Sequence, residues 1–189
     1  TNDAYPTSIK MALLSMNIEL VEKLKKIVEA FREKGKELAP VIKMGRTQLQ
    51  DAVPMSMGQE FEAYAATLEE DISKLNGNSN LFLEVNMGAT AIGTGLNAPV
   101  GYANLCAKNL SQLTGFGVVS APNLVEATPD TGSYVIYSSA LKRLAVKLSK
   151  ICNDLRLLSS GPRAGFFEIN LPPMQPGSSI MPGKVNPVI

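Results

Sequence analysis

The stretch that decides the fold is SIKMALLSMNIELVEKLKKIVEAFREKGK, residues 8–36. Apolar side chains recur in it every three or four residues, the spacing that places them along one side of an α-helix. At 1.5 Å per residue this helix would be about 40 Å long. The apolar stripe expected to face the core consists of Ile9, Leu13, Met16, Leu20, Leu24, Ile27, Val28 and Phe31.

Three further helices are expected downstream, two of them with long apolar stripes. Strand-like alternation is nearly absent, so the sequence predicts a mainly α protein built as a bundle of long helices. It carries too few helices to complete such a bundle. The residues that mark helix starts and ends are Ser56 with Gln59 as a capping box, Pro99, Gly115, Asp130 or Thr131, and Gly161.

Composition limits the classes of function. With 189 residues, 45% hydrophobic and 19% charged, the chain can build one sizeable domain. No run of 18 apolar residues would span a membrane, and a cytoplasmic setting is expected. A net charge of +1 without a basic block argues against a nucleic-acid partner.

The chain contains no histidine, which removes the commonest general base, the commonest metal ligand and every Ser-His arrangement. The two cysteines, Cys106 and Cys152, lie in apolar helical stretches, where free thiols are expected rather than a disulfide or a metal pair. No metal site is therefore predicted.

A loop rich in glycine and proline lies near the end of the chain, GSSIMPGKVNP at residues 177–187. Neither helix nor strand is expected there, and the loop can move as a hinged lid. It brings together two hydroxyls, a cation and an amide, which suits gripping a small carboxylate while one hydroxyl does proton chemistry. On composition alone, an ordinary surface loop is an equal alternative.

This loop resembles a signature of the fumarase/aspartase superfamily, whose members eliminate a group from a succinyl-type substrate to give fumarate. TND at residues 1–3 and GRTQLQDA at residues 45–52 resemble the other two signature regions, in the family order. LEVNMGATAIGTGLN at residues 83–97 and LLSSGPRAGFFEIN at residues 157–170 resemble its fumarase and aspartase branch. The chain is identified as a member of that superfamily over nearly its whole length.

The resemblance implies that residues 1–189 are the central helical-bundle domain, carrying all three signature regions, without the family's N-terminal and C-terminal domains. In the family the central bundles associate in a homotetramer, and three subunits contribute to each active site. We therefore expect the isolated fragment to be inactive and the activity to belong to the parent enzyme. The implied partners are a small dicarboxylate substrate and further copies of the chain.

The family's roles can be carried to the matching residues. Ser178 matches the base, which as an oxyanion removes a proton from the carbon beside the carboxylate that becomes an enediolate. Lys184, with nearby backbone N–H groups, is the available source of positive potential to stabilise that oxyanion. The implied substrate contacts are Thr1 and Ser179 on the enediolate carboxylate, Thr47, Lys184 and Asn186 on the other carboxylate, and Asn2 and Gln48 at the leaving group.

Other charged residues near the signatures are interpreted as structural. Arg46 and Asp51 are expected to hold the turn at Thr47, and Arg163 and Glu168 to support the lid. A plain turn before the Ser56 helix is the alternative interpretation of Thr47-Gln48. No cofactor is required by the resemblance, and activation by a divalent cation such as Mg²⁺ is left open.

Gln48 decides the branch of the family. Fumarases and some aspartases carry histidine there, whereas other aspartases carry glutamine. A neutral amide cannot titrate near pH 7, and elimination of ammonia tolerates this better than elimination of hydroxide, which needs a proton delivered to it. The expected reaction is conversion of L-aspartate to fumarate and ammonia. The alternatives are a class II type fumarate hydratase and a non-catalytic helical scaffold.

Overall fold

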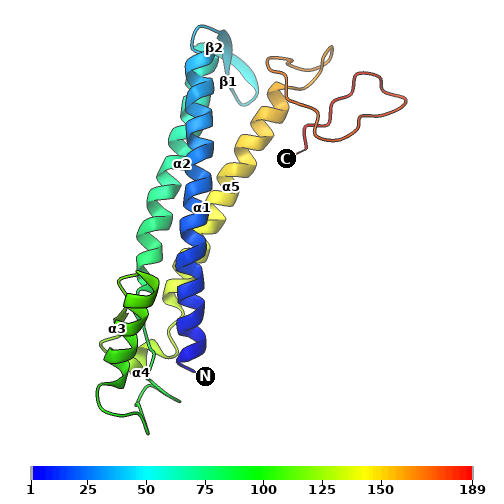
Figure 1. The fold of residues 1–189 in the computed structure, drawn as a ribbon. Coiled ribbons are helices and arrows are strands. Elements are labelled where there is room, and N and C mark those ends of the chain that lie inside the picture. The colour runs from blue at the N-terminus through cyan, green and yellow to red at the C-terminus, as the bar shows by residue number, and fades with distance from the viewer. Residues whose placement is uncertain (1, 189) are drawn as a thin grey trace. The chain divides into compact units, whose positions relative to one another are not determined.

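The computed structural model describes residues 2–188, and most of them are helical (Figure 1). The predicted mainly α fold is confirmed. The helices are α1 (Ala4–Glu37), α2 (Met57–Ser79), the 3-10 helix η1 (Asn80–Phe82), α3 (Tyr102–Thr114), α4 (Leu124–Ala127) and α5 (Gly132–Leu158). The strands are β1 (Ile42–Thr47), β2 (Gln50–Ser56), β3 (Glu84–Val85) and β4 (Val119–Ser120).

The chain divides into two compact units. Within the described residues, the first unit comprises residues 2–27 and 69–142, and the second comprises residues 28–68 and 143–188. The assignment of the whole chain to one central domain stays a prediction. No helix within residues 2–188 combines the length and the apolar character needed to cross a bilayer.

A buried polar network ties three helices together in the first unit. Tyr137 of α5 donates its hydroxyl to the Asn17 Oδ1 of α1 at 2.9 Å, and the Asn17 amide donates to the Ser79 hydroxyl of α2 at 3.3 Å. Phe82 is fully buried against the rings of Tyr134 and Tyr137. Because buried polar groups need partners, this network explains how an asparagine occupies a core position.

The buried face of α1 differs from the predicted stripe. Met16 and Ile27 are 64% and 38% exposed, so their predicted core positions are wrong. The buried positions recur with a seven-residue spacing, as in a helix seam of period 3.5. They are Thr7, Leu14, Asn17, Val21, Leu24, Val28 and Gly35. Helix α1 carries apolar residues on several faces, so the spacing of apolar residues could not by itself identify the face that is buried.

A second, smaller core in the first unit joins α3 to a short parallel sheet. Strand β3 pairs with β4 in parallel, and Val85, Ala107 and Val118 form the buried cluster beside it. Helix α3 ends as predicted at Gly115, whose φ of 74° is the left-handed conformation that favours glycine at a helix C-terminus. Helix α4 was not predicted, although Asn123 caps it by accepting from two backbone N–H groups.

The second unit is built on aromatic packing between α1 and α2. The rings of Phe31, Phe61 and Tyr64 lie with centroids 5.6–6.0 Å apart. Near this cluster the two helices approach so closely that a Cβ at Gly58 would lie 2.3 Å from the Gly35 carbonyl oxygen. Glycine is required at position 58 because no side chain fits between the backbones.

The start of α2 carries the predicted capping box. The Gln59 backbone N–H donates to the Ser56 hydroxyl at 3.1 Å, and the Ser56 N–H donates to the Gln59 side chain at 2.9 Å. The start of α5 also follows the prediction, because Asp130 accepts a hydrogen bond from the Gly132 N–H at 3.1 Å. Both caps satisfy backbone donors that a helix start leaves without partners.

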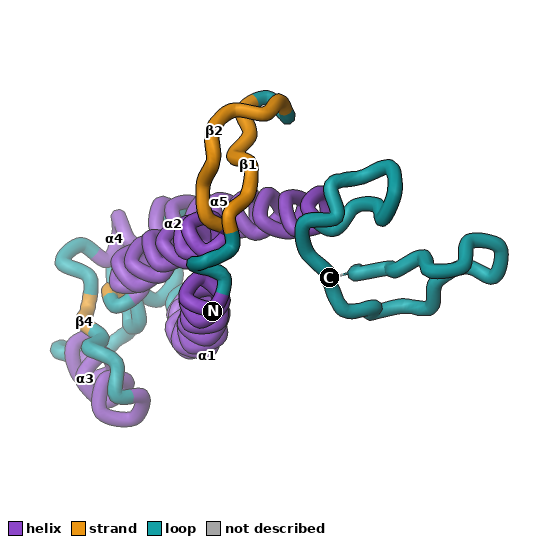
Figure 2. The backbone as a smooth tube through the Cα atoms, turned by 90° about the horizontal axis from the view of Figure 1, so that it is seen from above, coloured by secondary structure: helices purple, strands orange, loops and turns teal. Residues whose placement is uncertain are grey.

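The segment between α1 and α2 is an antiparallel hairpin, which the sequence did not predict beyond its turn. Strands β1 and β2 pair from Ile42 opposite Ser56 to Thr47 opposite Gln50, with an irregularity between Met44 and Arg46. Figure 2 shows this hairpin and the long loop that follows α5 to the C-terminus. Both belong to the second unit.

Candidate active site

The predicted lid is a loop whose two arms are joined at the base. Gln175 and Asn186 form an antiparallel bridge, and the Met174 N–H donates to the Asn186 carbonyl at 3.0 Å. The Asn186 side-chain amide donates to the Pro176 carbonyl at 2.7 Å. The same loop, closed at its base, therefore carries Ser178, Ser179 and Lys184.

Close backbone approach shapes the lid above its base. A Cβ at Gly177 would lie 2.5 Å from the Lys184 carbonyl oxygen, so only glycine lets the two arms pass here. A turn with Gly183 at φ 82° follows the Met181 carbonyl, which accepts from the Lys184 N–H at 3.1 Å. This packing brings the backbone beside Ser178 next to that of Lys184.

Thr47 and Gln48 lie at the tip of the β1–β2 hairpin. The two central residues of its turn, Gln48 and Leu49, have φ of 52° and 61°, the pattern of a type I′ turn. Such turns strongly prefer Asn-Gly or Gly-Gly, because positive φ is unfavourable for a residue with a long side chain. A strained turn of this kind persists only where its surroundings hold it.

Charged side chains hold the hairpin. Arg46 donates to the Glu168 carboxylate, lies with its guanidinium carbon 4.0 Å from the centre of the Phe166 ring, and approaches Asp51 at 3.9 Å. Lys43 forms ion pairs with Glu168, at 3.2 Å, and with Glu60. Arg46 and Asp51 contact each other beside the turn, as predicted, but this contact is long and exposed. Glu168 contacts the hairpin rather than the lid that it was predicted to support.

The Glu168 carboxylate is held ionised by its neighbours. Burial alone raises the pKa of Glu168, but the hydrogen bond from Arg46 and the positive charges of Lys43 and Arg46 outweigh burial and lower that pKa below its ordinary value. Burial also raises the pKa of the Tyr64 phenol, and the negative charges of Glu60 and Asp154 add to this effect. Glu168 is thus a fixed negative charge between two cations at neutral pH.

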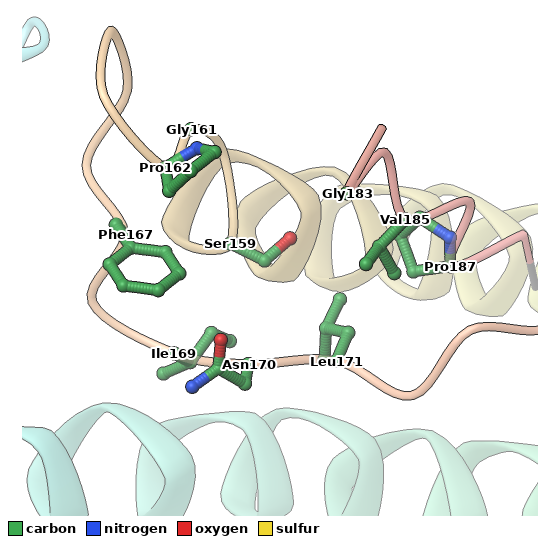
Figure 3. Close-up of a pocket in the computed structure, with 10 residues that line it drawn as sticks. All are labelled: Ser159, Gly161, Pro162, Phe167, Ile169, Asn170, Leu171, Gly183, Val185 and Pro187. Carbon is green, nitrogen blue, oxygen red and sulfur yellow. The ribbon is translucent and has the colours of Figure 1, made fainter. Parts of the chain in front are cut away.

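Besides a cavity of about 490 Å³ that has Asn186 in its lining, two cavities of the second unit border the predicted site residues. One of about 340 Å³ is lined by Gln48 together with Lys43, Arg46, Lys150 and Asp154. The other, of about 320 Å³, lies between the end of α5 and the returning arm of the lid (Figure 3). Its lining includes Ser159, Phe167, Leu171, Gly183, Val185 and Pro187.

Asn2 lies in the first unit, where it is clasped by the loop that precedes α3. Its side-chain amide donates to the Ala91 carbonyl at 2.7 Å, and its own carbonyl accepts from the Asn86 amide at 3.1 Å. Asp3 accepts from the N–H groups of Gly88 and Thr90 at 3.1 and 3.3 Å. The clasp fixes the backbone and the amide orientation of Asn2.

Asp3 also accepts from the Ala4 N–H at 2.8 Å, at the first residue of α1. Partial burial raises the pKa of Asp3, whereas hydrogen bonds from Ala4, Gly88 and Thr90 lower it, and the net effect is a lowered pKa. Asp3 is therefore ionised at neutral pH.

The predicted site residues fall into three groups. Ser178, Ser179, Lys184 and Asn186 share the lid, Thr47 and Gln48 share the hairpin tip, and Asn2 lies in the other unit. Thr1 lies outside the described residues. Sequence reasoning missed the buried Lys43, the ring of Phe166 over Arg46 and the clasp around Asn2. An acidic residue directly before a helix was the one local signal that could have indicated the role of Asp3.

A model of the lyase family matches residues 1–189, which is the whole chain. The chain belongs to that family. Among the described residues, no group of three or more Cys, Asp or Glu side chains could hold a metal ion.

The curated relatives of this lyase-family chain include aspartate ammonia-lyases. It is 59% identical over 189 residues to the enzyme of Escherichia coli strain K12 and 60% identical over 189 residues to that of Helicobacter pylori strain 26695. Each alignment covers 100% of this chain and 40% of the relative. The chain therefore spans 40% of the length of these relatives.

Solved lyase-family structures share its fold. A fumarate lyase:delta crystallin from Brucella melitensis, bound to cobalt, matches with a TM-score of 0.95 and 58% identity, over 98% of this chain and 40% of that one. A class II fumarase from Schistosoma mansoni matches with a TM-score of 0.92 and 34% identity, over 98% of this chain and 42% of that one. The predicted membership of the fumarase/aspartase superfamily is confirmed.

Proposed function

We propose that the whole protein is an aspartate ammonia-lyase, which eliminates ammonia from L-aspartate and releases fumarate. The observation that carries the proposal is 59–60% identity to aspartate ammonia-lyases over 100% of this chain. Identity to the class II fumarase structure is 34%. Gln48 supports the same branch, because an ammonium group leaves already protonated and needs no titrating side chain beside it.

In the proposed reaction, Ser178 acts as an oxyanion and removes a proton from the carbon next to one carboxylate of L-aspartate. That carboxylate becomes an enediolate, and Thr1 and Ser179 donate hydrogen bonds to it. These donors lower the barrier because the charge that they contact grows in the transition state. The enediolate then collapses, the carbon–nitrogen bond breaks, and the carbon–carbon double bond of fumarate forms as ammonia departs.

Lys184 has two parts in this proposal. Its positive charge lowers the energy of the Ser178 oxyanion, and with Thr47 and Asn186 it holds the carboxylate that does not react. The close passage of the Gly177 backbone at the Lys184 carbonyl supports the first part, because it keeps the two arms of the lid together.

The leaving group is assigned to Asn2 and Gln48. The Asn2 amide nitrogen donates to the Ala91 carbonyl, and the Oδ1 of the same amide is the acceptor that would contact the leaving group. An acceptor suits the ammonium group of L-aspartate, which is only a donor. The ionised Asp3 beside it adds negative potential that favours a cationic group.

A homotetramer in the cytoplasm is part of the proposal, with each active site shared by three subunits. Large apolar side chains on the long helices support association, since they are unusual on a free surface. Met16 of α1 and Val135 and Val146 of α5 are 64%, 60% and 61% exposed. Light scattering coupled to size exclusion would measure the mass, and a monomeric whole protein would contradict this part.

A fumarate hydratase is the second candidate, favoured by the match to the class II fumarase fold. The test is the ultraviolet absorbance of fumarate when the purified whole protein receives L-aspartate or L-malate. Fumarate from L-aspartate alone supports the ammonia-lyase. Fumarate from L-malate alone supports the hydratase, and fumarate from neither supports a non-catalytic scaffold.

A further inference from the structure

Four charged side chains gather where the β1–β2 hairpin meets the segment after α5. Their side chains are largely withdrawn from solvent: Lys43 is 6% exposed, Glu168 16%, Arg46 18% and Glu60 22%. Charges so withdrawn from water are costly unless they are paired with good geometry. The proposed chemistry uses none of these four residues, so their burial needs another explanation.

Glu168 is the centre of this cluster. One of its carboxylate oxygens accepts from the Arg46 guanidinium, and the other lies 3.2 Å from the Lys43 ammonium group. Both cations belong to β1, at either side of its irregularity. One carboxylate thus grips the strand at two points, and the ring of Phe166, two residues before Glu168, covers the face of the Arg46 guanidinium.

The Glu168 backbone is itself fixed to a rigid element. Its N–H donates to the carbonyl of Leu158, the last residue of α5, at 2.9 Å, and the neighbouring Phe167 N–H donates to Ser160 at 2.8 Å. The grip on the hairpin therefore connects β1 to the end of a long helix rather than to a mobile loop.

Arg46 directly precedes Thr47 and Gln48 at the hairpin tip. Gln48 and Leu49 occupy positive φ without a glycine, so the turn has an intrinsic tendency to relax into other conformations. A two-stranded hairpin has little stability of its own. The cluster supplies the external restraint that keeps the turn in the observed conformation.

We propose that Glu168 is a positioning residue for substrate binding, which acts through Arg46 and Lys43 to hold Thr47 and Gln48 in their binding geometry. This inference rests on the proposed function. It assigns the cluster to substrate affinity rather than to the proton-transfer step, because Ser178 lies on a different segment. Loosening the hairpin removes binding that substrate and transition state share, which raises KM more than it lowers kcat.

The test compares Glu168→Gln with Asp51→Asn in the whole protein. Asp51 also approaches Arg46, but its side chain is 78% exposed and its contact is 3.9 Å long, so it is the matched carboxylate outside the grip. We expect Glu168→Gln to raise KM for L-aspartate about tenfold or more, with a smaller change in kcat. Asp51→Asn should stay within about twofold of the wild type, since exposed ion pairs contribute little.

Arg46→Lys provides a second variant if Glu168→Gln fails to fold. It keeps the charge but loses the planar fork and the stacking on Phe166, so it should raise KM in the same direction. An unchanged KM in both variants, or an equal rise in Asp51→Asn, would overturn the inference.

Amide hydrogen exchange separates this inference from the proposed function. Residues 46–50 should exchange faster in Glu168→Gln than in the wild type, whether or not the protein acts on L-aspartate. A wild-type protein that makes no fumarate would overturn the proposed function alone. Unchanged exchange at the hairpin tip would overturn the positioning role alone.

Discussion

The side-chain amide of Asn186 donates a 2.7 Å hydrogen bond to the carbonyl of Pro176, ten residues earlier, and closes the base of the loop that carries Ser178 and Lys184. The backbone bridge between Gln175 and Asn186 lies at the same place. One residue of the signature therefore shapes the lid in addition to its proposed contact with substrate.

Replacing Asn186 with alanine should loosen the lid. The lost hydrogen bond contributes about 0.5–1.5 kcal/mol to closing the base, so open conformations should become several-fold more populated. Limited trypsin digestion after Lys184 measures this change. Gln175→Ala is the matched control, because Gln175 joins the bridge through its backbone. Equal cleavage rates in Asn186→Ala and the wild type would contradict the structural role.

Ser178→Ala should abolish turnover while the mass of the assembly stays unchanged. A positioned base contributes about 10²–10⁴-fold to a rate, and alanine cannot take up the proton. The assay is fumarate release from L-aspartate. Ser139→Ala is the control, since the Ser139 hydroxyl donates to the Val135 carbonyl in its own helix and lies outside the proposed site. Substantial activity in Ser178→Ala would remove Ser178 from the role of base.

Gln48→His should introduce a pH dependence that the wild type lacks at this position. Histidine tolerates positive φ better than most residues, so the turn can keep its backbone at φ 52°. An imidazole titrates at about pH 6.5, whereas the amide of glutamine does not change its charge in this range. The profile of kcat/KM against pH between about 5.5 and 7.5 measures the effect. Identical profiles for the two proteins would show that residue 48 does not contact the reacting groups.

Asp3→Ala should destabilise the protein at neutral pH by about 1 kcal/mol or more, the cost of a lost helix cap. The folded-state pKa of Asp3 lies below its ordinary value of 3.8, so its stabilisation is present above that value and disappears as the pH falls through the folded pKa. Urea midpoints at pH 7 and at acid pH give the comparison. If the urea midpoints of Asp3→Ala and the wild type differ more at acid pH than at pH 7, the predicted pH dependence of the stabilisation is wrong.

Gly58→Ala should destabilise the second unit by about 1–3 kcal/mol or more, because the added methyl group would lie 2.3 Å from the Gly35 carbonyl oxygen. Gly77→Ala in the same helix is the matched control. Among the described residues, nothing lies within 4 Å of a Cβ at Gly77, so alanine there should stabilise by about 0.5–1 kcal/mol. Thermal unfolding of both variants distinguishes them, and similar melting temperatures would contradict the packing argument.

The helices could be predicted because their signals are local. The capping box at Ser56 and Gln59 and the stop at Gly115 depend on residues a few positions apart, and the structure has both. The prediction of the buried face of α1 was partly wrong, since the apolar Met16 is exposed and the polar Asn17 is buried. Asn17 can be buried because its side chain accepts a hydrogen bond from Tyr137 of α5, 120 residues away.

The hairpin and its anchors could not be read from the sequence. Pro54 and the exposed residues of β2 do not alternate as a half-buried strand does, so only the turn was visible. The bond from Arg46 to Glu168 joins residues 122 positions apart, and the bond from Asn86 to Asn2 joins residues 84 apart. The signature motifs predict which residues contact the substrate, but the contacts that hold these residues depend on tertiary structure.

The most direct test of the central claim measures fumarate and ammonium together when the purified whole protein is incubated with L-aspartate. We predict equal amounts of the two products, loss of both in Ser178→Ala, and no fumarate from L-malate. Release of fumarate from L-malate without any reaction of L-aspartate would contradict it.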